Sequence, residues 1–136
     1  MVKRNNCYTY FKIDGNFNPD DVSKLLNLIP EQSWKIGDVG YKGVVYDFAH
    51  WEIGKCAEYD FEVENQMRKT IAPLLDKIPL LNRIKTENDV SLVLEIVPEI
   101  YAGEPTPCLA PPLDVIDFCH ATRTEIDIDM YVFPLD

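Results

Sequence analysis

The chain has 136 residues, 46% of them hydrophobic and 26% charged, which is the size and composition of one folded domain and too apolar for a disordered chain. Its formal net charge of −10 disfavours nucleic acid and anionic membranes as partners, because phosphate groups are bound by clustered Lys and Arg. The excess of acidic residues is concentrated in residues 95–136, where nine acidic residues and one basic residue give a net charge of −8.

Residues 7–13 are predicted to form the first strand, because apolar and polar side chains alternate with the period of a half-buried strand. The side chains on its predicted buried face are Cys7, Thr9, Phe11 and Ile13. The next segment predicts an amphipathic helix over residues 19–28. Asn18 is suited to cap this helix through its side chain, and Pro30 stops it.

Residues 44–53 are predicted to form a second strand with a bulge or bend near Ala49 and His50, because the apolar positions change parity there. They are Val44, Tyr46 and Phe48 before the bend, and Trp51 and Ile53 after it. The segment between Pro30 and Gly43 has no regular pattern and is expected to be a loop.

Asp60 is expected to begin a long helical stretch that Pro73 kinks or interrupts, because an interior proline removes a backbone hydrogen bond. Residues 90–96 alternate as a further strand, which Pro98 is expected to end. A last helix is predicted after Pro111 and Pro112. The side chains expected on its inward side are Leu113, Val115, Ile116 and Cys119.

Residues 125–133 show the clearest alternation in the chain and predict a strand with one buried face. The side chains expected to face the helices are Ile126, Ile128, Met130 and Val132. Asp127 and Asp129 should then lie on the other face, because adjacent strand residues point in opposite directions. The polar side of residues 7–13 suggests that the first and last strands are neighbours, with Lys12 near an aspartate.

Together these elements predict one α+β domain over residues 1–136, with a mainly antiparallel or mixed sheet of four to six strands and helices packed on one face. A ferredoxin-like layout is the first expectation for its topology. No segment is apolar and long enough for a signal peptide or a membrane span, so a cytoplasmic location is expected. The four scattered cysteines predict reduced thiols, and no metal site or cofactor is expected.

Several short motifs are distributed over nearly the whole chain. They are YFKIDG (residues 10–15), NPD (18–20), LIP (28–30), WKIGD (34–38), the later Trp51 and EIDIDMY (125–131). In this combination the chain resembles the bacterial family catalogued as domain of unknown function 4279. The resemblance implies a stand-alone bacterial cytosolic domain, and it implies no catalytic residues because the family is uncharacterised.

Two groups of residues are candidates for a binding site. Asp127 and Asp129 should lie roughly 6.5 to 7 Å apart on one strand face, where they could share a cation with Glu125 or act as an acid and base pair. The alternative is a solvated acidic face, or charges that protect a sheet edge. The second group is Trp34, Asp38 and Trp51, near the turn at Gly37, for which core packing is the alternative role.

No enzyme class is predicted, because the chain lacks the nucleophile, phosphate-loop and dinucleotide motifs, and His50 and His120 have no nucleophile beside them in sequence. The leading hypothesis is a small acidic module that binds a basic protein, for example an immunity-type inhibitor of a basic toxin. The competing hypothesis is a small-ligand binder or enzyme. Its site would lie near Trp34, Trp51 and the carboxylates of Asp127 and Asp129.

Overall fold

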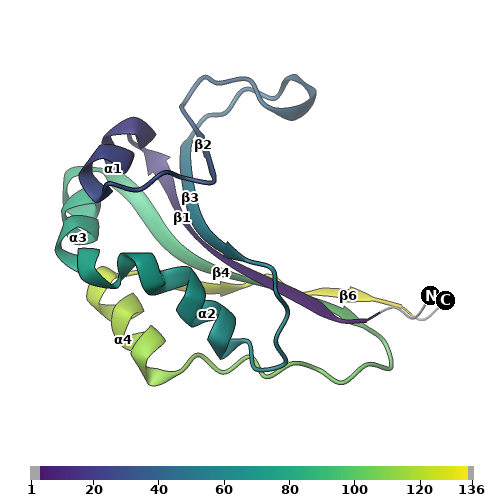
Figure 1. Ribbon diagram of the computed structural model, residues 1–136. Coiled ribbons are helices and arrows are strands. Elements are labelled where there is room, and N and C mark those ends of the chain that lie inside the picture. The colour runs from purple at the N-terminus through teal and green to yellow at the C-terminus, as the bar shows by residue number, and fades with distance from the viewer. Residues whose placement is uncertain (1–3, 135–136) are drawn as a thin grey trace.

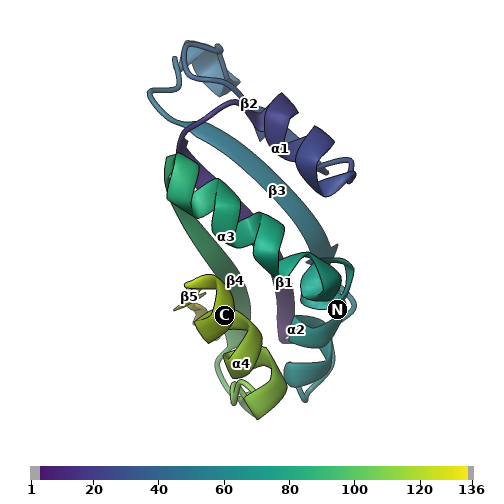
Figure 2. The same cartoon turned by 90° about the vertical axis from the view of Figure 1, so that its left-hand side faces the viewer.

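The structure is a computed structural model that describes residues 4–134. Its strands are β1 (Asn6–Asn16), β2 (Gln32–Trp34), β3 (Ala49–Cys56), β4 (Asp89–Tyr101), β5 (Glu125–Ile128) and β6 (Tyr131–Phe133). Its helices are α1 (Pro19–Leu26), α2 (Glu64–Ile71), α3 (Ile78–Glu87) and α4 (Leu113–Thr122), with the 3-10 helices η1 (Tyr41–Gly43) and η2 (Ala72–Lys77). The strands form one mixed sheet, and the helices cover one of its faces (Figures 1 and 2).

The strand order in the sheet is β2-β3-β1-β4-β5, and β6 lies beside β4 after β5 ends. Strand β1 is antiparallel to both β3 and β4, whereas β5 and β6 are parallel to β4. The α+β class, the mixed sheet and the helices on one face are therefore as predicted. From β1 to β4 the elements follow the β-α-β-β-α-β order of a ferredoxin-like layout, as expected, with these four strands antiparallel in the order β2-β3-β1-β4. Helix α4 and the parallel strands β5 and β6 are added to this layout at its β4 edge.

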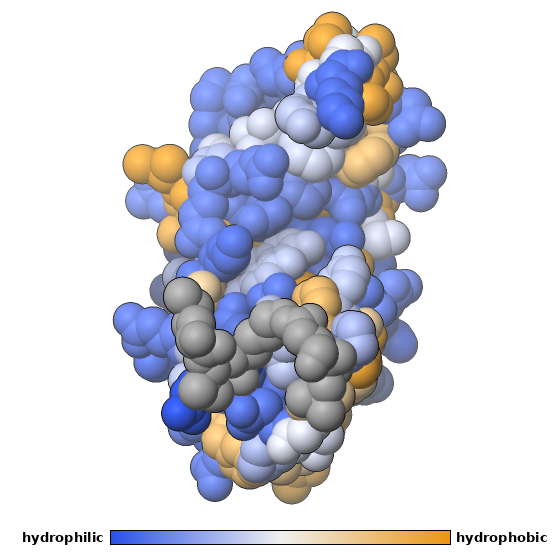
Figure 3. Space-filling view, turned by 90° about the vertical axis from the view of Figure 1, so that its right-hand side faces the viewer, coloured by the Kyte–Doolittle hydropathy of each residue, from blue (hydrophilic) through white to orange (hydrophobic). Residues whose placement is uncertain are grey.

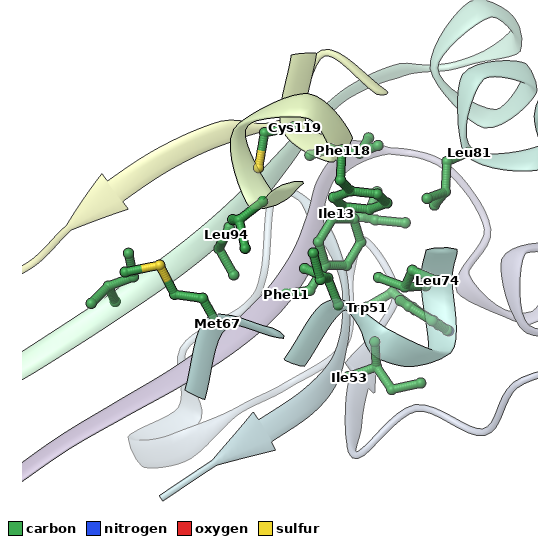
Figure 4. Close-up of a cluster of buried hydrophobic side chains, with 14 of the residues drawn as sticks. Phe11, Ile13, Trp51, Ile53, Met67, Leu74, Leu81, Leu94, Phe118 and Cys119 are labelled. Atoms are coloured by element: carbon green, nitrogen blue, oxygen red, sulfur yellow. The ribbon is translucent and has the colours of Figure 1, made fainter. Parts of the chain in front are cut away.

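The core lies between the sheet and the helices (Figure 4). The predicted inward residues of β1 are all buried, because the period of two places them on the helix side. Trp51 of β3 is fully buried on this side, and its Nε1 donates to Ser23 Oγ at 2.9 Å. Burial of each large apolar side chain stabilises the fold by roughly 1.5 to 3 kcal/mol, so this face drives folding.

A glycine bulge in β3 allows α2 to approach the sheet closely and to form a hydrogen bond with it. Thr9 and Phe11 of β1 face Cys56 and Ile53, so β3 has one extra residue here, and Gly54 adopts a left-handed φ of 75°. The carbonyl of Gly54 accepts a hydrogen bond from Thr70 Oγ1 of α2 at 2.7 Å. A side chain at Gly54 would meet the Thr70 carbonyl oxygen, so only glycine fits this approach.

Helix α1 begins where the sequence predicts. The side chain of Asn18 accepts a hydrogen bond from the Asp20 amide at 3.0 Å, which confirms Asn18 as the N-cap. The helix ends at Leu26, two residues earlier than predicted, because Asn27 adopts a left-handed conformation with φ of 54°. Ile29 is consequently exposed.

The predicted strand over residues 44–48 is wrong, because β3 begins only at Ala49. The preceding residues fold back on residues 37–39 instead of joining the sheet. The Tyr46 amide donates to Asp38 O at 2.9 Å, and the Gly37 amide donates to Tyr46 O at 2.8 Å. Residues 35–48 therefore form a projecting loop (Figure 1).

Two helix predictions need correction. The stretch predicted from Asp60 begins as a helix only at Glu64, while Pro73 interrupts it within η2 as expected. In α4 the inward prediction holds for Val115 and Cys119. Leu113 and Ile116 are exposed instead, and Phe118 takes the inward position between the two buried residues.

Strand β4 does not end at Pro98 as predicted but continues to Tyr101. On one side Pro98 faces Cys7 of β1. On the other side β5 pairs up to Ile96 and β6 pairs from Glu99 onward, so Pro98 lies where the edge pairing is interrupted. The missing N–H of proline is tolerated at such a position, and it divides the last predicted strand into β5 and β6.

The last strand lies beside β4 and not beside β1, so the predicted pairing of first and last strands is wrong. Its buried face is also shorter than predicted. Ile126 packs against the core, whereas Ile128, Met130 and Val132 are exposed. Figure 1 shows the reason, since β6 extends past the region of the sheet that the helices cover.

Candidate functional site

The face of the sheet without helices, hereafter the open face, carries the residues that alternate with the core. Tyr8, Tyr10, Lys12 and Asp14 of β1 project onto it. The strand register places Asp14 opposite His50 of β3 and Tyr10 opposite Glu95 of β4. Figure 3 looks onto the molecule from this side and shows mostly hydrophilic residues, with hydrophobic residues gathered at one end.

His50 is held between two carboxylates on the open face. It is 5% exposed, its Nδ1 contacts Asp14 Oδ1, and its Nε2 lies 3.0 Å from Glu52 Oε1. Because both acceptors are carboxylates, both ring nitrogens must donate, which requires the imidazolium form. Burial lowers the pKa of His50, but the hydrogen bonds to Asp14 and Glu52 outweigh burial and raise that pKa above its ordinary value.

An aromatic stack covers His50. The indole of Trp34 lies between Tyr46 and His50, with ring centroids 4.1 Å and 4.2 Å away and interplanar angles of 14° and 16°. Trp34 Nε1 donates to the carbonyl of Phe48 at 3.0 Å. A charged imidazolium against the indole face adds a cation–π attraction. The stack thereby anchors the projecting loop, residues 35–48, on the open face.

Ion pairs continue from His50 across the sheet. Lys12 Nζ lies 3.4 Å from Asp14 Oδ2 and 3.2 Å from Glu95 Oε1, so Lys12 bridges β1 and β4. Glu95 also lies opposite Asp127 of β5 in the strand register. We call these side chains the ionic row: Glu52, His50, Asp14, Lys12, Glu95 and Asp127.

The end of the ionic row holds two carboxyl groups together. Glu95 of β4 and Asp127 of β5 lie opposite each other, and two neighbouring carboxylates repel each other. Burial and the neighbouring Asp127 carboxyl raise the pKa of Glu95, while Lys12 acts in the opposite direction. A positive charge placed near this pair would offset that repulsion. The β5 side of the open face is therefore a favourable position for a cationic group.

The projecting loop carries an apolar tip at one end of the open face. The tip consists of Val39, Tyr41, Val44 and Val45, whose exposed fractions range from 57% to 82%. It is ordered by a bridge between Val39 and Val45 and by a hydrogen bond from the Gly40 amide to Val44 O at 2.7 Å. Exposed apolar clusters of this kind mark interaction sites in soluble proteins.

The structure separates the sequence-predicted site residues. Trp34 lies on the open face, whereas Trp51 lies in the core on the opposite face. Asp38 Oδ2 accepts from the Lys35 amide at 2.8 Å and orders the turn at the base of the loop. Glu125 and Asp127 line the β5 end of the open face, and Asp129 accepts from the Tyr131 hydroxyl at 3.1 Å.

Sequence reasoning missed His50 and Glu95. The sequence shows no nucleophile beside His50, and its partner Asp14 lies 36 positions away along the chain. The sequence does contain a signal for Glu95, because this charged residue lies between the apolar residues Leu94 and Ile96. The alternation of the strand places it on the open face. Pairing between distant strands cannot be obtained from such local patterns.

The remaining chemistry of the described chain is limited. Among residues 4–134, no three His, Cys, Asp or Glu side chains are arranged to hold a metal ion. Burial raises the pKa of both Cys7 and Cys119 to about 11, which keeps these thiols protonated and unreactive. Within the same range, no helix has the length and apolar character that crossing a membrane requires.

Comparison with known proteins identifies the family. A family model described as domain of unknown function (DUF4279) matches residues 5–133. No curated protein and no solved structure gives a significant match. The matched range includes all strands of the open face, together with the helices that support them. The chain therefore belongs to the DUF4279 family, as its motifs predicted.

Proposed function

We propose that this protein is a binding module that covers a basic surface of another protein with its open face. The observation that carries the proposal is the ionic row beside half-buried aromatic side chains of the open face. The acidic residues on or beside this face are Asp14, Glu52, Glu95, Glu99, Glu125, Asp127 and Asp129, and the basic ones are Lys12, His50 and Lys55. An acidic field of this kind steers and selects a basic partner.

The aromatic residues of the open face favour a protein partner. Protein interfaces are enriched in Tyr and Trp, which contribute large contact area together with a polar group. The rings of Tyr8 and Tyr10 stack near the centre of the open face, with their centroids 6.2 Å apart. Trp34 lies at one end of this face, beside the apolar tip. A broad surface with aromatic, acidic and apolar parts suits a folded partner.

The competing hypothesis of an enzyme or small-ligand site has less support. It requires Trp34, Trp51 and the carboxylates of Asp127 and Asp129 around one pocket, but the sheet lies between the two tryptophans. His50 is also a poor general base, because both ring nitrogens are already hydrogen-bonded to carboxylates. Within the proposed binding role, an immunity-type inhibitor that masks a basic toxin is the specific function that we favour.

The proposal is tested by capture of the partner from an extract of the native cells, with matched charge reversals. The open-face variant is Asp127→Lys combined with Asp129→Lys. The control is Asp76→Lys combined with Asp117→Lys, which makes the same charge change at exposed positions of η2 and α4. We expect a basic protein to bind the wild type and the control but not the open-face variant. Equal binding to all three would refute the proposal.

A further inference from the structure

The outer edge of the sheet, formed by β5 and β6, has unpaired backbone groups. Both strands pair with β4 on one side, and no strand within residues 4–134 pairs with the other side. The Asp129 amide donates to Ile96 O at 2.9 Å, and Phe133 O accepts from the Ala102 amide at 3.0 Å. Because these groups point toward β4, those of the alternate residues Ile128 and Val132 point outward.

Two rows of side chains flank this edge. On the open-face side are Glu125 and Asp127, which are paired with Val93 and Glu95 of β4. On the helix side, Ile128, Met130 and Val132 are 41% to 67% exposed beyond the cover of the helices. Charges alone would be consistent with an edge protected against pairing. An exposed apolar row beside free backbone groups is the opposite of such protection.

We infer that the β5–β6 edge pairs with an extended segment of the partner in which basic residues alternate with apolar residues. This inference rests on the proposed function and specifies how the partner is bound. A strand added to the edge would place alternate side chains on the two faces of the sheet. Its basic side chains would then meet Glu125 and Asp127 of β5, and its apolar side chains would cover Ile128 and Val132.

The charge of the edge fits this segment better than an acidic or neutral one. Asp127 lies opposite Glu95 in the strand register, and the pKa of Glu95 is raised because burial and this second carboxyl disfavour its charged form. A lysine or arginine of the added strand would pair with the exposed carboxylates of Glu125 and Asp127, where an acidic residue would be repelled. The free backbone groups supply affinity without sequence preference, and the two side-chain rows supply selectivity.

The probe is a synthetic peptide of alternating Lys and Val with blocked ends, titrated into the whole isotope-labelled protein and followed by amide NMR. The matched control peptide alternates Glu and Val. We expect the Lys–Val peptide to shift the amides of Ile126, Ile128 and Val132, and the Glu–Val peptide to leave them unchanged. Binding absent at about 1 mM, or shifts confined to the helices, would overturn the inference.

Variants of the edge separate backbone pairing from apolar contact. Ile128→Pro combined with Val132→Pro removes two outward N–H groups but keeps apolar side chains, and it should weaken binding at least about tenfold. The control, Ile128→Val with Val132→Ile, keeps the N–H groups and should bind like the wild type. Asp127→Lys tests the charge independently and should abolish binding. Undiminished binding by the proline or the lysine variant would overturn the inference.

Failure of the inference and failure of the proposed function give different results. If the captured basic protein is lost by the Asp127→Lys and Asp129→Lys variant but binds the proline variant normally, the edge inference is wrong and the proposed function stands. If the Lys–Val peptide binds the edge but no basic protein is captured, the edge pairing is established and the proposed function is wrong.

Discussion

Replacement of His50 by glutamine should destabilise the fold strongly. Glutamine is neutral, so Asp14 and Glu52 would face each other without the intervening cation, and its amide can donate to the two carboxylates only in a poor geometry. Removal of one partner from a buried ion pair costs about 3 to 5 kcal/mol. The Asp14 and Glu52 side chains retain 26% and 14% exposure, so solvent relieves part of the repulsion. We therefore expect a loss of about 3 kcal/mol.

Urea unfolding measures this loss as a lower midpoint at unchanged slope. The matched control is His120→Gln, at an exposed position of α4, which should change the free energy of unfolding by no more than about 0.5 kcal/mol. Asp14→Asn combined with His50→Gln should recover part of the stability, because one of the two facing charges is removed. A loss below about 1 kcal/mol for His50→Gln would refute the assignment of His50 as a buried imidazolium.

Three further predictions concern pH, the bulge and the first helix. Because the folded-state pKa of His50 is raised, the stability that His50 contributes to the fold should be complete below the unfolded pKa of about 6.5 and should be lost as pH rises through the folded pKa. NMR titration of His50 and unfolding at several pH values measure this dependence. A folded-state pKa that is not raised would contradict it. Gly54→Ala should lower the free energy of unfolding by about 3 kcal/mol, measured by heat or urea, because the new Cβ would lie 2.5 Å from the Thr70 carbonyl oxygen at a left-handed φ. A loss of stability under about 1 kcal/mol would show that α2 shifts freely. Asn18→Ala should cost about 1 kcal/mol, whereas Asn18→Ser should cost little, because serine keeps an acceptor for the Asp20 amide.

Local sequence patterns predicted the parts of the fold that local forces decide. The alternation in β1 predicted its buried face, and Asn18 with Pro19 predicted the start of α1. Both predictions succeeded because a strand period and a helix cap each depend on a few consecutive residues. The α+β class followed from the order of these elements. The same reasoning failed at residues 44–48, where the apolar alternation belongs to a loop that pairs with itself.

The candidate site depended on long-range pairing and was predicted only in part. Trp34 and Asp127 were identified from their residue types and patterns, and both lie on the open face. His50 and Glu95 were missed, because their partners are set by the register of β3, β1 and β4. The sequence predicted that the first and last strands are neighbours, but β4 lies between them. Glu95 of β4 therefore lies between Lys12 and Asp127.

The central claim, that the open face binds a basic protein, is tested most directly by hydroxyl-radical footprinting of the complex with the captured partner. Exposed side chains on both sides of the sheet serve as reporters. Tyr41 of the apolar tip and Tyr131 of β6 represent the open-face side, and Leu75 and Leu113 represent the helix side. We predict that the partner protects the two tyrosines and leaves the two leucines as reactive as in the free protein. Protection of Leu75 and Leu113 with unchanged Tyr41 and Tyr131 would contradict this claim.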